Sequence, residues 1–314
     1  LGCELYRYDG ARVEMLVGEG LPTFRSPGFG NPDNGGMPSM AVYDGALYMG
    51  TFNRDTGCEL WRHNGTDYEK LVGVGRPGFQ APGFGNPDNY RIGAMAAMGD
   101  YLYMGTSNDS GCELWRYDGA AFEKYGLLGP GFGDPENNRF PSIAVQVGAV
   151  LLGTFNITNG CDVFRWDGTA FTQVVGQSPP GTPGTGPGFG DAFNVVAESM
   201  VVHEGGLFVG THNSMTGCEI WRWNGTTWYK IAGTGLAGNS APGFGNVFNR
   251  SVWALASYGP WLYAGTLNND EGCEVWRYNG VAWAPEAGVG MGTDTTASVA
   301  SMCVYGAGMY AGMT

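Results

Sequence analysis

One nine-residue phrase recurs six times along this 314-residue chain and strongly limits what it can fold into. The copies read GCELYRYDG, GCELWRHNG, GCELWRYDG, GCDVFRWDG, GCEIWRWNG and GCEVWRYNG, and their cysteines are Cys3, Cys58, Cys112, Cys161, Cys218 and Cys273. Two further phrases, one like ALYMGTFN and one beginning PGFG, alternate with it in a fixed order. Repetition every 49 to 57 residues indicates a repeat fold in which each copy is one supersecondary unit.

Each repeat reads as four short β-strands. In residues 39–72 the segments SMAVYDG, ALYMGTFN, GCELWRHNG and TDYEKLV follow one another, each with a short apolar or alternating run. Their Asp-Gly and Asn-Gly pairs suit tight hairpins, because both turn residues need a positive φ. No stretch keeps the 3.6-residue period of an amphipathic helix over a useful length. A four-strand period of this length is typical of a β-propeller blade.

The two ends of the chain complement each other. Residues 3–17 correspond to the third and fourth strands of a repeat, and residues 298–314 correspond to the first and second. Pairing them in one blade would hide both sheet edges. The sequence therefore predicts an all-β fold: a single six-bladed β-propeller over residues 1–314. Its four-stranded antiparallel blades would be closed by N-terminal strands pairing with C-terminal strands.

The net negative charge of the chain limits which kinds of molecule it is expected to bind. The chain holds 16 basic and 29 acidic residues, a formal net charge of −13. Such a surface repels nucleic-acid phosphates and anionic membranes. No apolar run approaches the ~18 residues that a membrane-spanning helix requires. We therefore expect no nucleic-acid partner and no membrane insertion.

The phrase GCELWRYDG, with LYMGT in the preceding strand position, resembles the repeats of the bacterial ELWxxDGT-repeat proteins, which are secreted or surface β-propellers. The resemblance covers the whole chain, once per blade. The chain departs from that group in carrying Cys before the Glu, in its PGFG loops, and in lacking the Thr after the glycine in several blades. The resemblance implies a propeller at an extracellular or cell-surface location, and it carries over no activity.

Alternate residues of the repeated strand point to opposite faces, so that Cys58 and Arg62 share one face while Glu59 and Trp61 share the other. We expect the aromatic residues to pack between blades, with a ring of sugar-stacking platforms as the alternative. We also expect free, buried thiols and ion pairs from each Glu to an Arg of a neighbouring blade. The main repeat positions are Glu59, Trp61, Arg62, Glu113, Trp115, Arg116, Glu219, Trp221, Arg222, Glu274, Trp276 and Arg277.

The loops that follow each PGFG are rich in oxygen ligands. Candidate ligands are Asn31, Asp33, Asn86, Asp88, Asp134, Glu136 and Asp191. Clustered carboxylate and amide oxygens suit Ca²⁺, which is the one cofactor that the sequence suggests. Alternatively, Asn and Asp side chains in such loops close turns onto their own backbone.

A second set of candidate binding residues lies where strands meet loops. Arg91, Arg139 and Arg250 directly precede or begin the innermost strands, where they could rim a central channel and hold an anion. The loops between second and third strands contribute Asn53, Asn108, Asn156, Asn213 and Asn268. We expect these residues on the same loop face as the arginines.

Catalytic motifs are missing from the sequence. There is no G-x-S-x-G elbow, P-loop or HExxH motif, and most acidic residues belong to the repeat. The sequence favours an extracellular or cell-surface, non-catalytic binding or scaffold module for protein partners, compatible with membership of a larger surface assembly. Two alternatives stay open: a multivalent lectin with pockets between blades, and an enzyme that acts on a polysaccharide or ester in the central channel.

Overall fold

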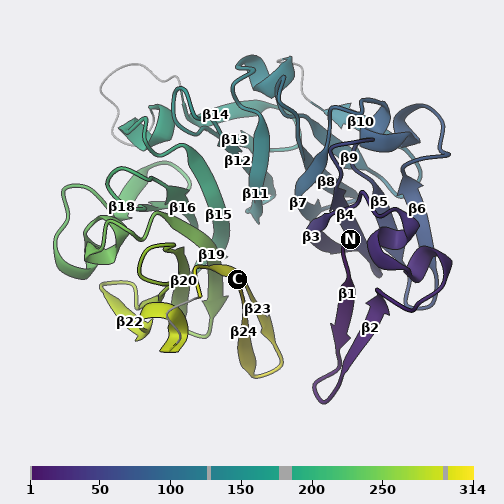
Figure 1. The fold of residues 1–314 in the computed structure, drawn as a ribbon. Helices are drawn as coiled ribbons and strands as arrows, with labels where there is room; N and C mark the ends of the chain where they lie inside the picture. The colour runs from purple at the N-terminus through teal and green to yellow at the C-terminus, as the bar shows by residue number, and fades with distance from the viewer. Residues whose placement is uncertain (1, 126–128, 177–185, 293–295) are drawn as a thin grey trace. The chain divides into compact units, whose positions relative to one another are not determined.

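The computed structural model describes residues 2–125, 129–176, 186–292 and 296–314. The chain forms two compact units, Leu1–Phe140 and Pro141–Thr314, which are described here one at a time. Figure 1 shows that both consist of antiparallel β-strands joined by short loops and single 3-10 turns. The all-β prediction is confirmed.

The first unit contains one hairpin and two complete four-stranded meanders. Its strands are β1 (Leu5–Tyr8), β2 (Val13–Val17), β3 (Gly36–Tyr43), β4 (Ala46–Phe52), β5 (Leu60–His63), β6 (Tyr68–Val72), β7 (Arg91–Met98), β8 (Tyr101–Ser107), β9 (Leu114–Tyr117) and β10 (Phe122–Tyr125). Strands β1 and β2 pair with each other. Consecutive pairing joins β3 to β6 and β7 to β10.

The second unit continues the same pattern. Its strands are β11 (Arg139–Gln146, which begins in the first unit), β12 (Ala149–Phe155), β13 (Val163–Trp166), β14 (Phe171–Val175), β15 (Val196–His203), β16 (Gly206–His212), β17 (Ile220–Trp223), β18 (Trp228–Ala232), β19 (Ser251–Tyr258), β20 (Trp261–Leu267), β21 (Val275–Tyr278), β22 (Trp283–Ala287), β23 (Val299–Tyr305) and β24 (Gly308–Met313). The groups β11–β14, β15–β18 and β19–β22 are meanders, and β23 pairs with β24. The predicted four-strand repeat is thus confirmed. The blade count and the closure of the ends stay predictions.

Asp44-Gly45 forms the predicted two-residue turn, whereas Asp9-Gly10, Asn64-Gly65 and Asp118-Gly119 lie in four-residue turns in which only the glycine has a positive φ. Between β3 and β4, Asp44 and Gly45 have φ values of 45° and 70°. This left-handed pair matches the twist of the two flanking strands and reverses the chain in two residues. The turn therefore fixes the register Tyr43↔Ala46 at the start of the ladder.

A glycine in the second strand of each repeat lets neighbouring repeats approach closely. A Cβ added at Gly50 would lie 2.6 Å from Ile92 Cβ, and one at Gly210 would lie 2.5 Å from Val252 Cβ. Gly105, Gly153 and Gly265 have equivalent contacts with Phe140, Ala197 and Val299. The glycine of the MGT-type phrase is therefore a packing requirement and not a turn signal.

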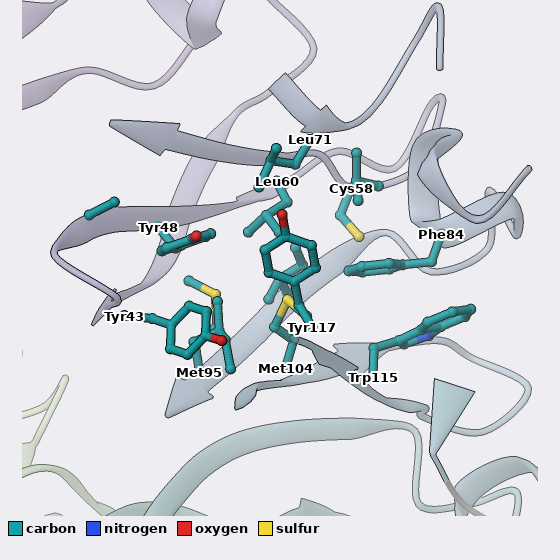
Figure 2. Packing of buried hydrophobic residues seen from close by; sticks show 14 residues of the cluster. Tyr43, Tyr48, Cys58, Leu60, Leu71, Phe84, Met95, Met104, Trp115 and Tyr117 are labelled. Atoms are coloured by element: carbon teal, nitrogen blue, oxygen red, sulfur yellow. The ribbon is translucent and has the colours of Figure 1, made fainter. Parts of the chain in front are cut away.

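The PGFG loops supply the aromatic contact between repeats. Phe84, in η4 (Pro82–Gly85), stacks on Trp115 of β9 with ring centroids 4.8 Å apart (Figure 2). Its left-handed φ of 60° follows that of Gly83, at 63°, and burial of the ring offsets that backbone cost. The pairs Phe29–Trp61, Phe189–Trp221 and Phe244–Trp276 repeat the stack. The predicted packing role of the repeated tryptophans is confirmed.

The repeated cysteines pack as small apolar side chains. Cys58, Cys112, Cys161, Cys218 and Cys273 are buried free thiols, as expected, while Cys3 is half-buried and the non-repeated Cys303 is exposed. Cys58 lies in the core cluster between Leu60 and Phe84 (Figure 2). Burial raises the pKa of the Cys58 thiol well above its usual range.

Candidate functional site

The repeated glutamate forms the centre of a buried hydrogen-bond network. Asn89 Nδ2 donates to Gly83 O at 2.9 Å and to Glu113 Oε2 at 2.8 Å. Trp115 Nε1 donates to the same carboxylate oxygen at 3.0 Å, and Lys124 Nζ donates to Glu113 Oε1 at 2.6 Å. The same bond from Asn to Glu joins Asn34 to Glu59, Asn194 to Glu219 and Asn249 to Glu274, so that four PGFG loops are tied to a carboxylate of the next third strand. A buried carboxylate with this many partners stabilises the fold.

The predicted ion pairs between repeated Glu and Arg residues are wrong. Glu59 pairs with Lys70 at 2.9 Å, whereas Arg62 pairs with Glu69 at 3.6 Å on the same two strands. Cross-strand register decides this outcome, because Arg62 lies directly opposite Glu69. Four other strand arginines have acids nearby, in the pairs Arg7–Glu14, Arg116–Glu123, Arg165–Asp167 and Arg277–Glu286. Arg222 instead lies over the ring of Phe208.

The asparagines expected on the loop surface lie in the interior instead. Asn53 Nδ2 donates to Asn34 Oδ1 at 3.1 Å, while its own Oδ1 accepts the backbone N–H groups of Asp55 and Thr56. The equivalent residues Asn108, Asn156, Asn213 and Asn268 are also buried. Their expected position is therefore wrong, because their side chains hold the second-to-third-strand loops in shape.

The proposed calcium ligands mostly close turns. Asn86 Oδ1 accepts the backbone N–H of Asp88 at 3.1 Å, and Asp191 Oδ1 accepts that of Phe193 at 3.0 Å. Asn31 and Asp134 make the same turn with Asp33 and Glu136. Across the described ranges, no group of three or more His, Cys, Asp or Glu residues could hold a metal ion. Calcium binding at these loops stays a prediction.

The three candidate channel arginines have different surroundings. Arg250 pairs with Asp270 at 2.8 Å and lies over the ring of Phe248. Arg91 and Arg139 are the first residues of β7 and β11, and both are half-buried. A common channel rim would involve both units, so the anion site stays a prediction.

A pocket of about 420 Å³ lies in the first unit, between η3 (Gly78–Gln80) with η4 on one side and β9 with β10 on the other. Its lining residues are Gly78, Phe79, Phe84, Gly85, Asn86, Glu113, Trp115 and Lys124. The exposed Phe79 ring is tilted against Trp115 at 5.3 Å. The pocket therefore combines aromatic walls with an ammonium group and a carboxylate.

The second unit carries exposed apolar side chains on adjacent loops. We call Ile157, Phe193, Met215, Val247 and Phe248 the apolar loop face, since all five are exposed and lie outside the strands. Hydrogen bonding joins two of these loops, because Asn213 Nδ2 donates to Asp191 Oδ2 at 3.2 Å.

The remaining loops of that face also touch. The Cβ position of Gly160 lies 3.1 Å from Ala192 Cα, and that of Gly217 lies 2.9 Å from Gly243 N. These contacts connect the loop of Ile157 to that of Phe193, and the loop of Met215 to that of Val247. The four loops that carry these five side chains are therefore neighbours of one another.

The sequence predicted neither the pocket beside Trp115 nor the apolar loop face, although residues of both differ between the copies of the repeat. The residue two after the first loop Asn or Asp is acidic in the first three copies (Asp33, Asp88 and Glu136) but is Phe193 and Phe248 in the next two. Comparing the copies position by position would have revealed these exchanges.

No family model and no curated protein matches the chain. Among solved structures it is similar to the GH74 xyloglucanase of Xanthomonas campestris, with 17% identity and a TM-score of 0.52 over 87% of this chain and 43% of that one. It is also similar to the extracellular domain assigned to a one-component system of B. thetaiotaomicron, with 15% identity and a TM-score of 0.55 over 98% and 34% of the two chains.

A third neighbour is YCF48, solved with D1 peptide, with 11% identity and a TM-score of 0.52 over 95% of this chain and 80% of that one. The fold is a β-propeller. At these identities the similarity shows the fold alone, and the chain spans less than half the length of the first two neighbours. Within the described residues, no helix has the length and apolar character needed to cross a membrane.

Proposed function

We propose that this β-propeller is a non-catalytic binding module that holds a protein partner on the apolar loop face of its second unit. The observation that carries the proposal is the exposure of Ile157, Phe193 and Met215 on connected loops. Contiguous exposed apolar surface mostly marks an interaction site. Large apolar and aromatic side chains supply most of the binding energy at such sites.

The repeat itself supports a non-catalytic role. The carboxylates of Glu59, Glu113 and Glu219 are each held by Lys, Trp and Asn side chains within the fold. Carboxylates used in this way are not free to act as a general acid or base. An enzyme that acts on a polysaccharide or ester in the channel is the weaker alternative.

An extracellular or cell-surface location belongs to the same proposal. Its support is the resemblance to ELWxxDGT-repeat proteins and the extracellular origin stated for one structural neighbour. Propeller neighbours include one described with a bound peptide. These likenesses are compatible with a module that presents its loops to a partner outside the cell.

The test compares capture by three immobilised forms of the whole chain. Wild type is set beside a Phe193→Asp/Val247→Asp double variant and a Val281→Asp control, and captured proteins are quantified from the native source. Val281 is exposed in the β21–β22 turn, outside the apolar loop face. We expect a specific partner that is retained by the control and lost by the double variant.

Two outcomes would contradict the proposal. One is an identical captured set for wild type and the double variant, which would show that the loop face is not used. The other is loss of the partner in the Val281→Asp control as well, which would show a general effect of added charge. Thermal unfolding of each variant confirms that the protein tested is folded.

A further inference from the structure

The surroundings of the pocket beside Trp115 differ in part from the same position in two other repeats. In the repeats centred on Trp61 and Trp221, the lysine opposite the tryptophan is largely covered, with side-chain exposures of 20% for Lys70 and 23% for Lys230. Lys124 pairs with its glutamate in the same way but is 49% exposed. The ion pair faces solvent here more than in its two counterparts.

The segment between the fourth strand of a repeat and the next PGFG also differs in length among these three repeats. After β6, residues 73–81 lead to the next PGFG, and Arg76 Nη2 donates to Lys70 O within that segment. After β18, the Thr234 N–H donates to Glu219 Oε1 and its carbonyl accepts from Lys230 Nζ. After β10 only residues 126–129 make the connection. In sequence, the stretch that provides Arg76 and Thr234 in those two repeats is therefore shorter after β10.

We propose that this pocket binds one neutral pyranose ring, with a C–H face against Phe79 and hydroxyl groups on Lys124. The site is in the first unit, so the proposal is independent of the protein partner assigned to the second. A volume of about 420 Å³ falls at the small end of ligand pockets. One sugar ring fits it, while a long glycan would extend into solvent.

The chemistry of the lining favours a sugar over other small molecules. Lys124 Nζ keeps two N–H donors after its bond to Glu113 Oε1. Asn86, which also lines the pocket, uses its Oδ1 in a turn and has its amide group as a further donor. Because Glu113 compensates the lysine charge, the pocket favours neutral oxygen acceptors such as hydroxyl groups. The Phe79 ring adds an apolar wall.

The chain contains a natural counterpart without these features. In the repeat centred on Trp276, Asn239 stands where Phe79 stands, and Pro285 stands where Lys124 stands. Asn239 Nδ2 instead donates to Trp283 O. We therefore expect no sugar to bind in the repeat centred on Trp276.

The experiment is saturation-transfer difference NMR on the intact chain with a panel of neutral methyl pyranosides. We expect transfer to at least one sugar, with Kd on the order of 1 mM, typical of a single small ring. Phe79→Ala should weaken binding by about fivefold to tenfold. Phe24→Ala is the matched control, since Phe24 is equally exposed and is tilted on Trp61 at 5.6 Å.

Each result decides the proposal. Transfer that Phe79→Ala removes and Phe24→Ala retains supports it. Silence across the panel, or equal transfer to the Phe79→Ala variant, overturns it. Binding of N-acetyl-tyrosinamide in place of every sugar also overturns it, because the pocket would then be a peptide side-chain site. Unfolding curves verify that both variants are folded, as expected for exposed side chains.

Discussion

Gly210 is the residue whose substitution tests most directly how the repeats pack. It lies in β16, paired on one side with Ser199 and on the other with Ile220. An alanine Cβ there would lie 2.5 Å from Val252 Cβ and 2.8 Å from Ser199 Oγ. Real Cβ atoms do not approach this closely, so Gly210→Ala must move a neighbour.

The neighbours have little freedom to move. Val252 is fully buried in β19, and Ser199 Oγ donates to Val252 O at 2.7 Å. Overpacking of a well-ordered core costs about 1–3 kcal/mol, while replacing glycine stabilises by about 0.4–1 kcal/mol through the unfolded chain. We expect a net loss of about 1–2 kcal/mol in the free energy of unfolding. The corresponding fall in Tm is about 2–8 °C for a domain of this size class.

Urea and thermal unfolding, followed by tryptophan fluorescence, measure the effect. Gly36→Ala is the matched control, because its Cβ would meet only Phe52 Cβ at 3.6 Å, an ordinary contact. The control should change the free energy of unfolding by no more than about 0.5 kcal/mol. In a Val252→Gly background, the cost of Gly210→Ala should become clearly smaller, since the Cβ atom that it meets at 2.5 Å is gone.

Equal stability of the Gly210→Ala and Gly36→Ala variants would refute the close-packing argument. So would a cost of Gly210→Ala that is unchanged in the Val252→Gly background. In that case the loss would come from the strand backbone and not from contact between repeats.

Three further predictions concern the polar network and the thiols. Asn194→Ala removes the donor to Gly188 O and to Glu219 Oε2, and should cost at least about 2 kcal/mol in urea unfolding. Asn224→Ala, in an exposed turn, should cost less than about 1 kcal/mol; equal losses would contradict the network. Burial alone would raise the pKa of Glu219, but hydrogen bonds from Lys230, the Thr234 N–H and Asn194 hold it below its usual value of 4.5. Because the pKa of Glu219 is lower in the folded chain than in the unfolded chain, the ionised side chain stabilises the fold at pH values above 4.5. This stabilisation should be lost as the pH falls from 4.5 through the folded-state pKa. Glu219→Gln should therefore flatten that part of the plot of unfolding free energy, measured in urea, against pH. In native protein, a thiol-specific chromogenic reagent should modify Cys303 rapidly and the five buried cysteines only on unfolding; rapid modification of more than two thiols would contradict their burial.

The strands could be predicted from the sequence because the repeat reports them several times. Asp44-Gly45 marks a hairpin that the structure forms with two positive φ values. The Asp-Gly or Asn-Gly pair after each third strand marks a longer, four-residue turn with a positive φ at the glycine alone. Local turn chemistry and strand alternation are encoded within a few residues. This is why the four-strand unit and its buried tryptophans were predicted correctly.

Side-chain partners could not be predicted in the same way. The spacing of Glu59 and Arg62 suggested contact between blades, yet Glu59 binds Lys70, eleven residues further along the chain. The choice follows from cross-strand register and from burial, and both depend on the folded hairpin. The asparagine at position 53 looked like a loop ligand for the same reason: its partner Asn34 is 19 residues earlier in the sequence.

Function in a repeated fold is best sought where copies of one position differ. The positions that all or most repeats share, such as the glycine at 210 and the glutamate at 219, have structural partners that explain them. Phe193 stands where the first three copies have an acid, and its side chain is 54% exposed, which lowers solubility without adding burial. A departure that stabilises nothing in the fold is best explained by a partner, and this links the loop face to binding more firmly than the repeat itself does.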